Sequence, residues 1–148
     1  MGSPSQTPAA QRHSVQPTAI VYPLGLWVVM AVLAVINGIF RETMLIPRIG
    51  TYPGHLLSTA LLVVAILAVS AGYFAYTSID YTRTERLLVG MIWVVLTVGF
   101  EFLIGYLEGV PVSETIAQYD VLGGQVWIVV PITLLAAPLL FGAYFARE

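Results

Sequence analysis

Four stretches of the chain are each long and apolar enough to cross a lipid bilayer as a single helix. A bilayer core needs about 20 predominantly apolar residues per helix. The segments that meet this requirement cover residues 20–41, 55–77, 86–107 and 121–146. Because lipid offers no partner for a backbone N–H or C=O, such a segment satisfies these groups internally as a helix. The sequence therefore predicts an all-α, polytopic membrane protein, a four-transmembrane-helix bundle with short loops.

Composition supports a membrane protein and excludes several kinds of chemistry. Hydrophobic residues make up 58% of the chain and charged residues only 9%, whereas a soluble domain has roughly 25% charged residues. The formal net charge of -2 provides no basic surface, so we expect no nucleic-acid partner. The chain has no cysteine, and all its basic residues are arginine. Disulfides, thiolate metal sites, cysteine nucleophiles and lysine Schiff bases are therefore excluded.

The arginines predict the orientation of the chain. Residues 1–18 are rich in Ser, Pro, Gln and Thr, and we expect them to form a disordered cytoplasmic tail before a four-helix domain at residues 19–148. Four spans place both termini on one side of the membrane. That side carries Arg12, Arg83, Arg86 and Arg147, against Arg41 and Arg48 on the other. The positive-inside rule therefore predicts a multi-pass protein of the cell membrane with both termini in the cytoplasm.

Polar side chains of the spans gather in one half of the predicted bundle. Spans one and three end on the outer side and spans two and four begin there, so position in the sequence gives depth. The polar residues of this outer half are Asn37, Arg41, Glu42, His55, Ser58, Thr97, Glu101, Asp120 and Gln125. The inner halves of the spans contain no ionisable residue. We therefore predict one polar cluster beneath the outer surface, which acts as a ligand-binding site.

Glu101 is the central member of this predicted cluster. It lies about 9 Å inside the end of its span, where a charge costs on the order of 2.5 to 3.5 kcal/mol and is usually functional. Arg41 shares a helical face with Asn37, and its long side chain can reach inward to bind the Glu101 carboxylate. We expect these residues to meet His55 inside the bundle, with Glu42 facing outward or toward span four.

Several cluster residues also have a purely structural interpretation. Arg41 can extend to the lipid headgroups, which leaves a protonated Glu101 hydrogen-bonded to Thr97, Asn37 or His55. Asp120 is most simply the cap of the fourth span, and His55 can be an anchor, a hydrogen-bond donor or a proton acceptor.

Other positions are predicted to be structural only. Trp27 and most tyrosines lie near span ends, as interface anchors do. Pro131 and Pro138 lie inside the fourth span, where each is expected to bend the helix. Asp80, Arg83, Glu85 and Arg86 are expected in a hydrated loop and helix start, with Thr84 as the cap of the third span.

Four motifs together resemble a known family. They are "NGIFRE" ending the first span, "GHLLSTALL" opening the second, "IWVVLTVGFEFLIG" in the third and "YDVLGGQVW" before the fourth. Residues 20–147 are similar in this pattern to a family of small, uncharacterised four-span prokaryotic membrane proteins. The resemblance implies a four-span fold and no particular activity.

Three functions remain open. The first is binding or moving a small polar ligand, a proton or a lipid headgroup in the outer-leaflet cluster; one four-helix bundle is narrow, so an oligomer is expected for transport. The alternative is an accessory or assembly subunit of a larger membrane complex. An intramembrane enzyme is least favoured, because His55, Ser58, Glu101 and Asp120 match no known catalytic arrangement. We assign no catalytic residue, metal or cofactor, and expect as partners the lipid bilayer and either further copies of the chain or a membrane complex.

Overall fold

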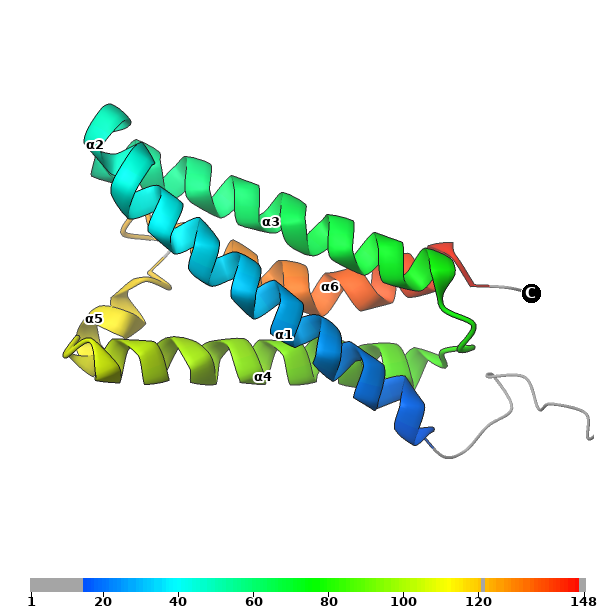
Figure 1. Cartoon of the computed structure of the whole chain (residues 1–148). Coiled ribbons are helices and arrows are strands. Elements are labelled where there is room, and N and C mark those ends of the chain that lie inside the picture. The colour runs from blue at the N-terminus through cyan, green and yellow to red at the C-terminus, as the bar shows by residue number, and fades with distance from the viewer. Residues whose placement is uncertain (1–14, 121, 147–148) are drawn as a thin grey trace, which may run out of the picture.

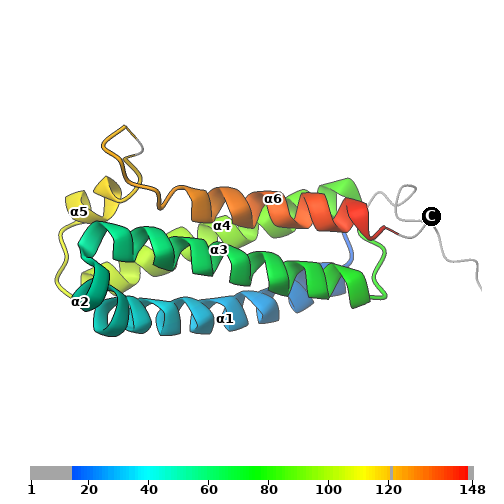
Figure 2. The ribbon, with the colours of Figure 1, turned by 90° about the horizontal axis from the view of Figure 1, so that it is seen from above.

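The computed structural model describes residues 15–120 and 122–146, and every regular element in this part of the chain is a helix (Figure 1). The elements are α1 (Pro17–Phe40), the π-helical turn η2 (Arg41–Leu45), α2 (Ile46–Ile49), α3 (Thr51–Tyr76), α4 (Arg83–Leu107), α5 (Val112–Ala117) and α6 (Val129–Tyr144). The four longest helices run roughly along one axis (Figure 2). The predicted all-α class is confirmed, whereas residues 1–14 of the expected tail lie outside the described residues.

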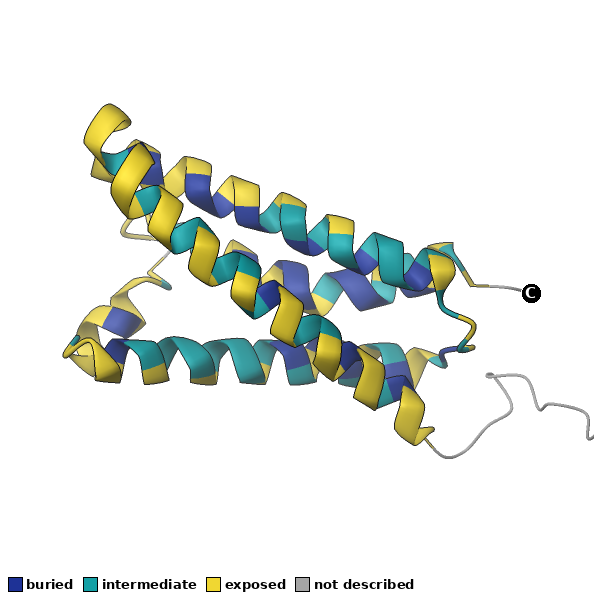
Figure 3. Ribbon diagram, viewed as in Figure 1, coloured by how far each residue is buried: buried dark blue, intermediate teal, exposed yellow. Residues whose placement is uncertain are grey.

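Three helical segments are long and apolar enough to cross a membrane. They are Pro17–Ile49, in which α1, η2 and α2 are continuous, with 33 residues, α3 with 26 residues and α4 with 25 residues. Their outward faces are apolar too: Val32 of α1, Val64 of α3 and Val95 of α4 are all exposed. Figure 3 shows such exposed positions repeating along the outer side of α1 and α3. A helix that is hydrophobic all round is typical of a membrane span.

The fourth apolar segment is shorter than the sequence predicts. Residues 122–128 form turns, and α6 begins only at Val129 and has 16 residues. The reason is local: Gly124 adopts a φ of 88°, which a helix cannot contain. Pro131 therefore lies in the first turn of α6, where it has no helical N–H to lose, and it marks the helix start instead of a bend. Of the two prolines only Pro138 lies inside the helix.

Asp120 caps this turn and not the fourth helix. Its Oδ1 accepts a hydrogen bond from the Gly123 N–H at 3.0 Å, and its carbonyl accepts one from the Gln125 N–H at 3.0 Å. The Tyr52 hydroxyl of α3 donates to the Gly124 carbonyl at 3.0 Å, which ties the turn to the bundle. The predicted role of Asp120 as a helix cap is wrong, because the helix that it would cap begins at Val129.

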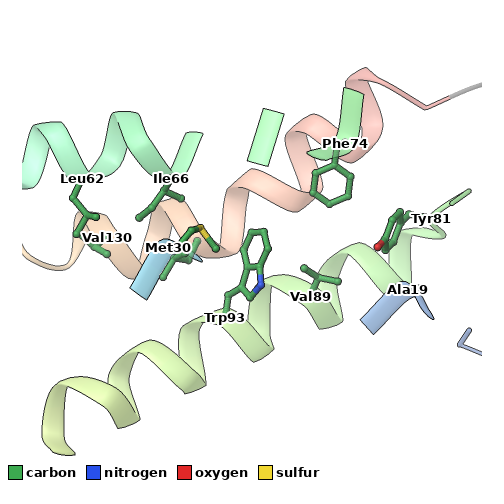
Figure 4. Packing of buried hydrophobic residues seen from close by; sticks show 10 residues of the cluster. Ala19, Met30, Leu62, Ile66, Phe74, Tyr81, Val89, Trp93 and Val130 are labelled. Atoms are coloured by element: carbon green, nitrogen blue, oxygen red, sulfur yellow. The ribbon is translucent and has the colours of Figure 1, made fainter. Parts of the chain in front are cut away.

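α6 packs against α4 and α3, and α1 covers one side of this layer. The α4–α6 interface is close at Gly90, where an added Cβ would lie 2.8 Å from the Leu135 carbonyl oxygen. Trp93 fills the centre and donates from Nε1 to the Pro23 carbonyl of α1 at 2.9 Å. Figure 4 shows Met30 from α1 beside Leu62, Ile66 and Val130 at a second point of the same core. The core thus joins all four long helices.

A buried polar network closes the end of the bundle where α4 begins. Thr82, not Thr84, caps α4: its hydroxyl accepts from the Glu85 N–H at 3.1 Å, and Glu85 Oε1 accepts from the Thr82 N–H at 2.9 Å. Glu85 Oε2 also accepts from the Gln16 N–H at 3.0 Å, so one carboxylate joins the starts of α1 and α4. Glu85 is 0% exposed, which corrects the expectation that it lies in a hydrated loop.

Because Tyr81 is buried at the end of the bundle where α4 begins, we expect the free energy of unfolding to fall at alkaline pH. Burial raises the pKa of the Tyr81 phenol, and the hydrogen bond to Tyr73, the charge of Tyr73 and that of Glu85 raise it further. The folded chain then resists ionisation while the unfolded chain ionises near a pKa of about 10. The stabilisation is therefore complete below about pH 10 and is lost progressively as the pH rises above it.

Ultraviolet titration of the tyrosines, combined with unfolding curves at several pH values, measures this effect. The Tyr81→Phe variant should lose one late ionisation and part of the alkaline destabilisation. Tyr76, which is 89% exposed, provides the matched control in Tyr76→Phe. Identical alkaline behaviour of the two variants would contradict the expectation.

Candidate functional site

A cavity of about 600 Å³ lies in the half of the bundle that contains the ends of α1 and α4. It exists for two reasons. First, α1 crosses α4 near its own beginning and diverges from it toward α2, as Figure 1 shows. Second, α6 begins late, so no regular fourth helix fills this half of the bundle. The space is lined by α1, η2 and α4 on two sides, by Leu62 and Ile66 of α3 behind, and by Thr115 and Gln118 of the α5 region at the end.

The cavity has a polar end and an apolar end. The polar lining comes from the last turns of α1 and α4 and from neighbouring segments: Asn37, Arg41, Glu42, Thr43, Thr97, Glu101, Glu108, Thr115 and Gln118. Deeper in the bundle the lining is apolar, with Met30, Leu62, Ile66, Val130 and Leu134. Thr97, Glu101 and Gly105 follow one another at intervals of four residues on α4 and all line the cavity, as their shared helical face requires.

Arg41 bends back along α1 toward the interior of the bundle. Its guanidinium lies beside Gly38, where an added Cβ would be in ordinary contact with Arg41 Nη2 at 3.7 Å. Arg41 Nε lies 3.3 Å from Glu42 Oε1, and the Arg41 side chain is 22% exposed against 60% for Glu42. In the described part of the chain no nitrogen of Arg41 lies within 4.0 Å of a Glu101 oxygen. The expected direct pair of Arg41 with Glu101 is therefore wrong: the cavity separates them, and the adjacent Glu42 takes the contact.

Glu101 has an aromatic and polar surrounding on the α4 side of the cavity. The charge of Arg41 lies within electrostatic reach of its carboxylate, and the Trp127 indole N–H is close enough to act as a hydrogen-bond donor to it. Tyr119 is also near: burial, followed by the charge of Glu101, raises the pKa of the Tyr119 phenol. The Trp127 Nε1 and the Tyr119 hydroxyl are both buried, and the indole N–H lies close to the Glu101 carboxylate and to the Tyr119 hydroxyl without a well-aligned hydrogen bond to any described residue. Trp127, Tyr119 and Glu101 thus form one buried polar group beside the cavity.

Two aromatic rings, those of Trp27 and Phe100, pack between α1 and α4 close to Glu101. Trp27 Nε1 donates to Thr97 Oγ1 at 3.0 Å. The Trp27 ring meets the Phe100 ring edge-on, with centroids 5.9 Å apart. Trp27 was expected to be an interface anchor, but it lies inside the bundle as a wall of the cavity. Its distance of about 10 Å from the expected span start at residue 20, at 1.5 Å per residue, is the signal that the sequence offered.

Asn37 and Ser58 join the outer end of α1 to α3. Asn37 Nδ2 donates to the Ser58 carbonyl at 3.1 Å, and the Ser58 hydroxyl donates back to Asn37 Oδ1. Ser58 is buried, so this reciprocal pair is shielded from solvent. Asn37 also lines the cavity, whereas Ser58 supports it from behind.

The structure separates three predicted residues from the cavity lining. His55 is exposed, and Arg41 and Glu42 are its charged neighbours, not Glu101. Asp120 and Gln125 belong to the exposed turn before α6. Of the nine predicted residues, the lining therefore contains Asn37, Arg41, Glu42, Thr97 and Glu101. Sequence reasoning missed Trp127, because it lies inside the segment 121–146 that was expected to be one continuous helix, whereas α6 begins only at Val129.

Within residues 15–120 and 122–146, no three His, Cys, Asp or Glu side chains are grouped so that they could hold a metal ion. Comparisons with protein-family models, with curated proteins and with solved structures find no match.

Proposed function

We propose that the chain is a multi-pass membrane protein that binds an amphipathic, lipid-like molecule in the cavity between α1 and α4. The observation that carries this proposal is the order of the lining. Polar groups lie at the ends of α1 and α4, and apolar groups lie deeper, around Met30, Leu62 and Val130. A lipid of the outer leaflet has the same order, with its headgroup at the surface and its chains toward the midplane.

The entrance to the cavity also suits a ligand that comes from the bilayer. Val35 and Ile39 line the cavity on the α1 side and are 45% and 59% exposed. Exposed apolar residues at an entrance are expected where lipid, not water, lies outside. The cavity therefore opens sideways between two helices that are proposed to span the membrane.

The broken fourth segment supports a functional cavity as well. Irregular backbone at membrane depth is tolerated only where it is buried in protein or lines a cavity. Residues 122–128 are irregular, and Trp127 of this stretch lines the cavity. Binding sites of membrane proteins are often built from such interrupted helices. In the proposed orientation the start of α1 and the end of α6 lie on the cytoplasmic side, consistent with their position at one end of the bundle in Figure 1.

Filling the cavity tests the proposal. Ala34 lines the cavity, and an Ala34→Trp substitution places an indole in the space for the lipid chain. Val32 points outward on the same helix, so Val32→Trp is the matched control. Native mass spectrometry of the protein purified in mild detergent should show retained lipid for the wild type and Val32→Trp, and a loss for Ala34→Trp. Equal retention by the two variants, or no lipid on the wild type, would overturn the proposal.

The second candidate is an accessory subunit of a membrane complex or a homo-oligomer. The sideways opening favours it, because a helix of a partner or of a second copy can also cover an exposed apolar gap. In this case the purified chain should carry a partner in fixed stoichiometry, and cross-links from Ile39 should reach that partner. Cross-links from Ile39 to lipid alone would favour the first candidate.

A further inference from the structure

Two opposite walls of the cavity carry opposite charges, and these restrict the charges that the headgroup of a bound ligand can have. Arg41 belongs to the α1 side and Glu101 to the α4 side, and the cavity lies between them. They are near enough to influence each other but, within the described residues, share no contact of 4.0 Å or less. The only hydrogen bond of the Arg41 side chain in this part of the chain runs from Nε to Glu42, so its two terminal amino groups remain available.

A ligand head between these walls meets two opposite demands. A purely anionic head near Arg41 leaves its charge facing Glu101, and like charges that face each other in a poorly hydrated site cost several kcal/mol. A purely cationic head near Glu101 would in the same way face the positive charge of Arg41. A head that carries both charges satisfies each wall with a charge-assisted hydrogen bond.

The groups around Glu101 favour a primary ammonium as the cationic part. The Glu101 carboxylate lines the cavity and accepts hydrogen bonds. A primary ammonium can donate N–H groups to it, whereas a quaternary ammonium has no N–H to donate. The Phe100 ring lines the same space and can contact the ammonium with its π face.

We infer that the ligand has a phosphoethanolamine-type zwitterionic head, with its phosphate at Arg41 and its primary ammonium at Glu101. This inference rests on the proposed function, because the order of the lining places such a head at the outer end of a bound lipid. The Trp127 Nε1 is a donor only, so it can pair with the phosphate or with the carboxylate.

Lipid competition tests the inference on the unmodified protein. The protein is offered phosphatidylethanolamine, phosphatidylcholine and phosphatidylglycerol with identical chains, and the bound species are quantified by native mass spectrometry. We expect phosphatidylethanolamine to be preferred over either competitor by about tenfold, the value of one charge-assisted hydrogen bond. Glycerophosphoethanolamine, which has the head without the chains, should not displace the lipid.

Two pairs of variants assign the charges. Glu101→Gln should abolish the preference for phosphatidylethanolamine over phosphatidylglycerol, and Arg41→Gln should weaken binding of all three lipids. Glu114→Gln on α5 and Arg48→Gln, whose partners are the carbonyl and sulfur of Met44, are exposed controls that should behave like the wild type.

The outcomes separate the two levels of the proposal. Lipids that bind without headgroup preference would overturn this inference and leave the proposed function intact. A preference that survives Glu101→Gln would likewise remove the assigned role of the acid. Displacement by glycerophosphoethanolamine would show that the ligand is a water-soluble zwitterion. It would overturn the proposal that the ligand is a lipid. Absence of any bound lipid on the wild type would overturn both.

Discussion

Replacement of Gly90 by alanine is expected to lower the free energy of unfolding by about 2 kcal/mol, and replacement by leucine by more. A Cβ at this position would lie 2.8 Å from the Leu135 carbonyl oxygen and 3.1 Å from the Leu135 Cα. Both are backbone atoms, so no side-chain rotation can relieve the contact. α4 and α6 would have to separate along the interface on which the bundle depends. Small residues have this role wherever membrane helices approach closely.

Gly99 provides the matched control for Gly90. It lies on the same helix, and a Cβ added there has no neighbour within 4 Å. Gly99→Ala should therefore change stability by less than about 1 kcal/mol, in the stabilising direction, because alanine is the better helix former. Unfolding by a denaturing detergent, followed by circular dichroism, measures both variants. Equal stabilities for Gly90→Ala and Gly99→Ala would show that the close α4–α6 approach is unimportant.

Replacement of Glu85 by alanine should destabilise the protein by about 3 kcal/mol, since two hydrogen bonds to a charged acceptor are lost, each with about 1.5 kcal/mol or more. The N–H groups of Gln16 and Thr82 donate to this carboxylate and would be left without it. The capping box of α4 would keep only its other half, the bond from the residue 85 backbone N–H to the Thr82 hydroxyl.

Hydrogen exchange locates the effect of the Glu85 substitution. The amide of Gln16 and those of the first turn of α4 should exchange faster in Glu85→Ala, while amides near Leu62 change little. Glu114→Ala, at an exposed position of α5, is the control and should leave exchange at Gln16 unchanged. A Glu85→Ala protein as stable as the control would refute the assigned role.

Hydropathy predicted the helices well where the chain is regular. The expected spans 20–41, 55–77 and 86–107 overlap α1, α3 and α4 over nearly their whole lengths. It did not predict the start of α6, because residues such as Val126, Trp127 and Ile128 are apolar whether or not the backbone is helical. The Gly123–Gly124 pair and Pro131 were the better signals, since they mark a turn and a helix start.

For the candidate site, too, the sequence predicted which residues of one helix share a face, but not how far apart two helices lie. Helical spacing places Asn37 with Arg41, and Thr97 with Glu101, and each pair lines the cavity. Spacing says nothing of the distance between two helices, so it could not show that the cavity keeps Arg41 from Glu101. Nor could it show that the carboxylate of Glu85, near the opposite end of α4, is completely buried. That burial depends on the path of the chain before α1.

For the proposed membrane protein, the 16-residue length of α6 has a consequence for the lipid around it. At about 1.5 Å per residue this helix measures about 24 Å, less than the hydrocarbon thickness of about 30 Å in a typical bilayer. The other three helical segments are long enough, so the mismatch falls on one flank of the protein only. In a bilayer that the helices cross as proposed, lipid on that flank would have to thin locally or tilt its chains. The protein should therefore accumulate in the thinner regions of a membrane with laterally varying thickness.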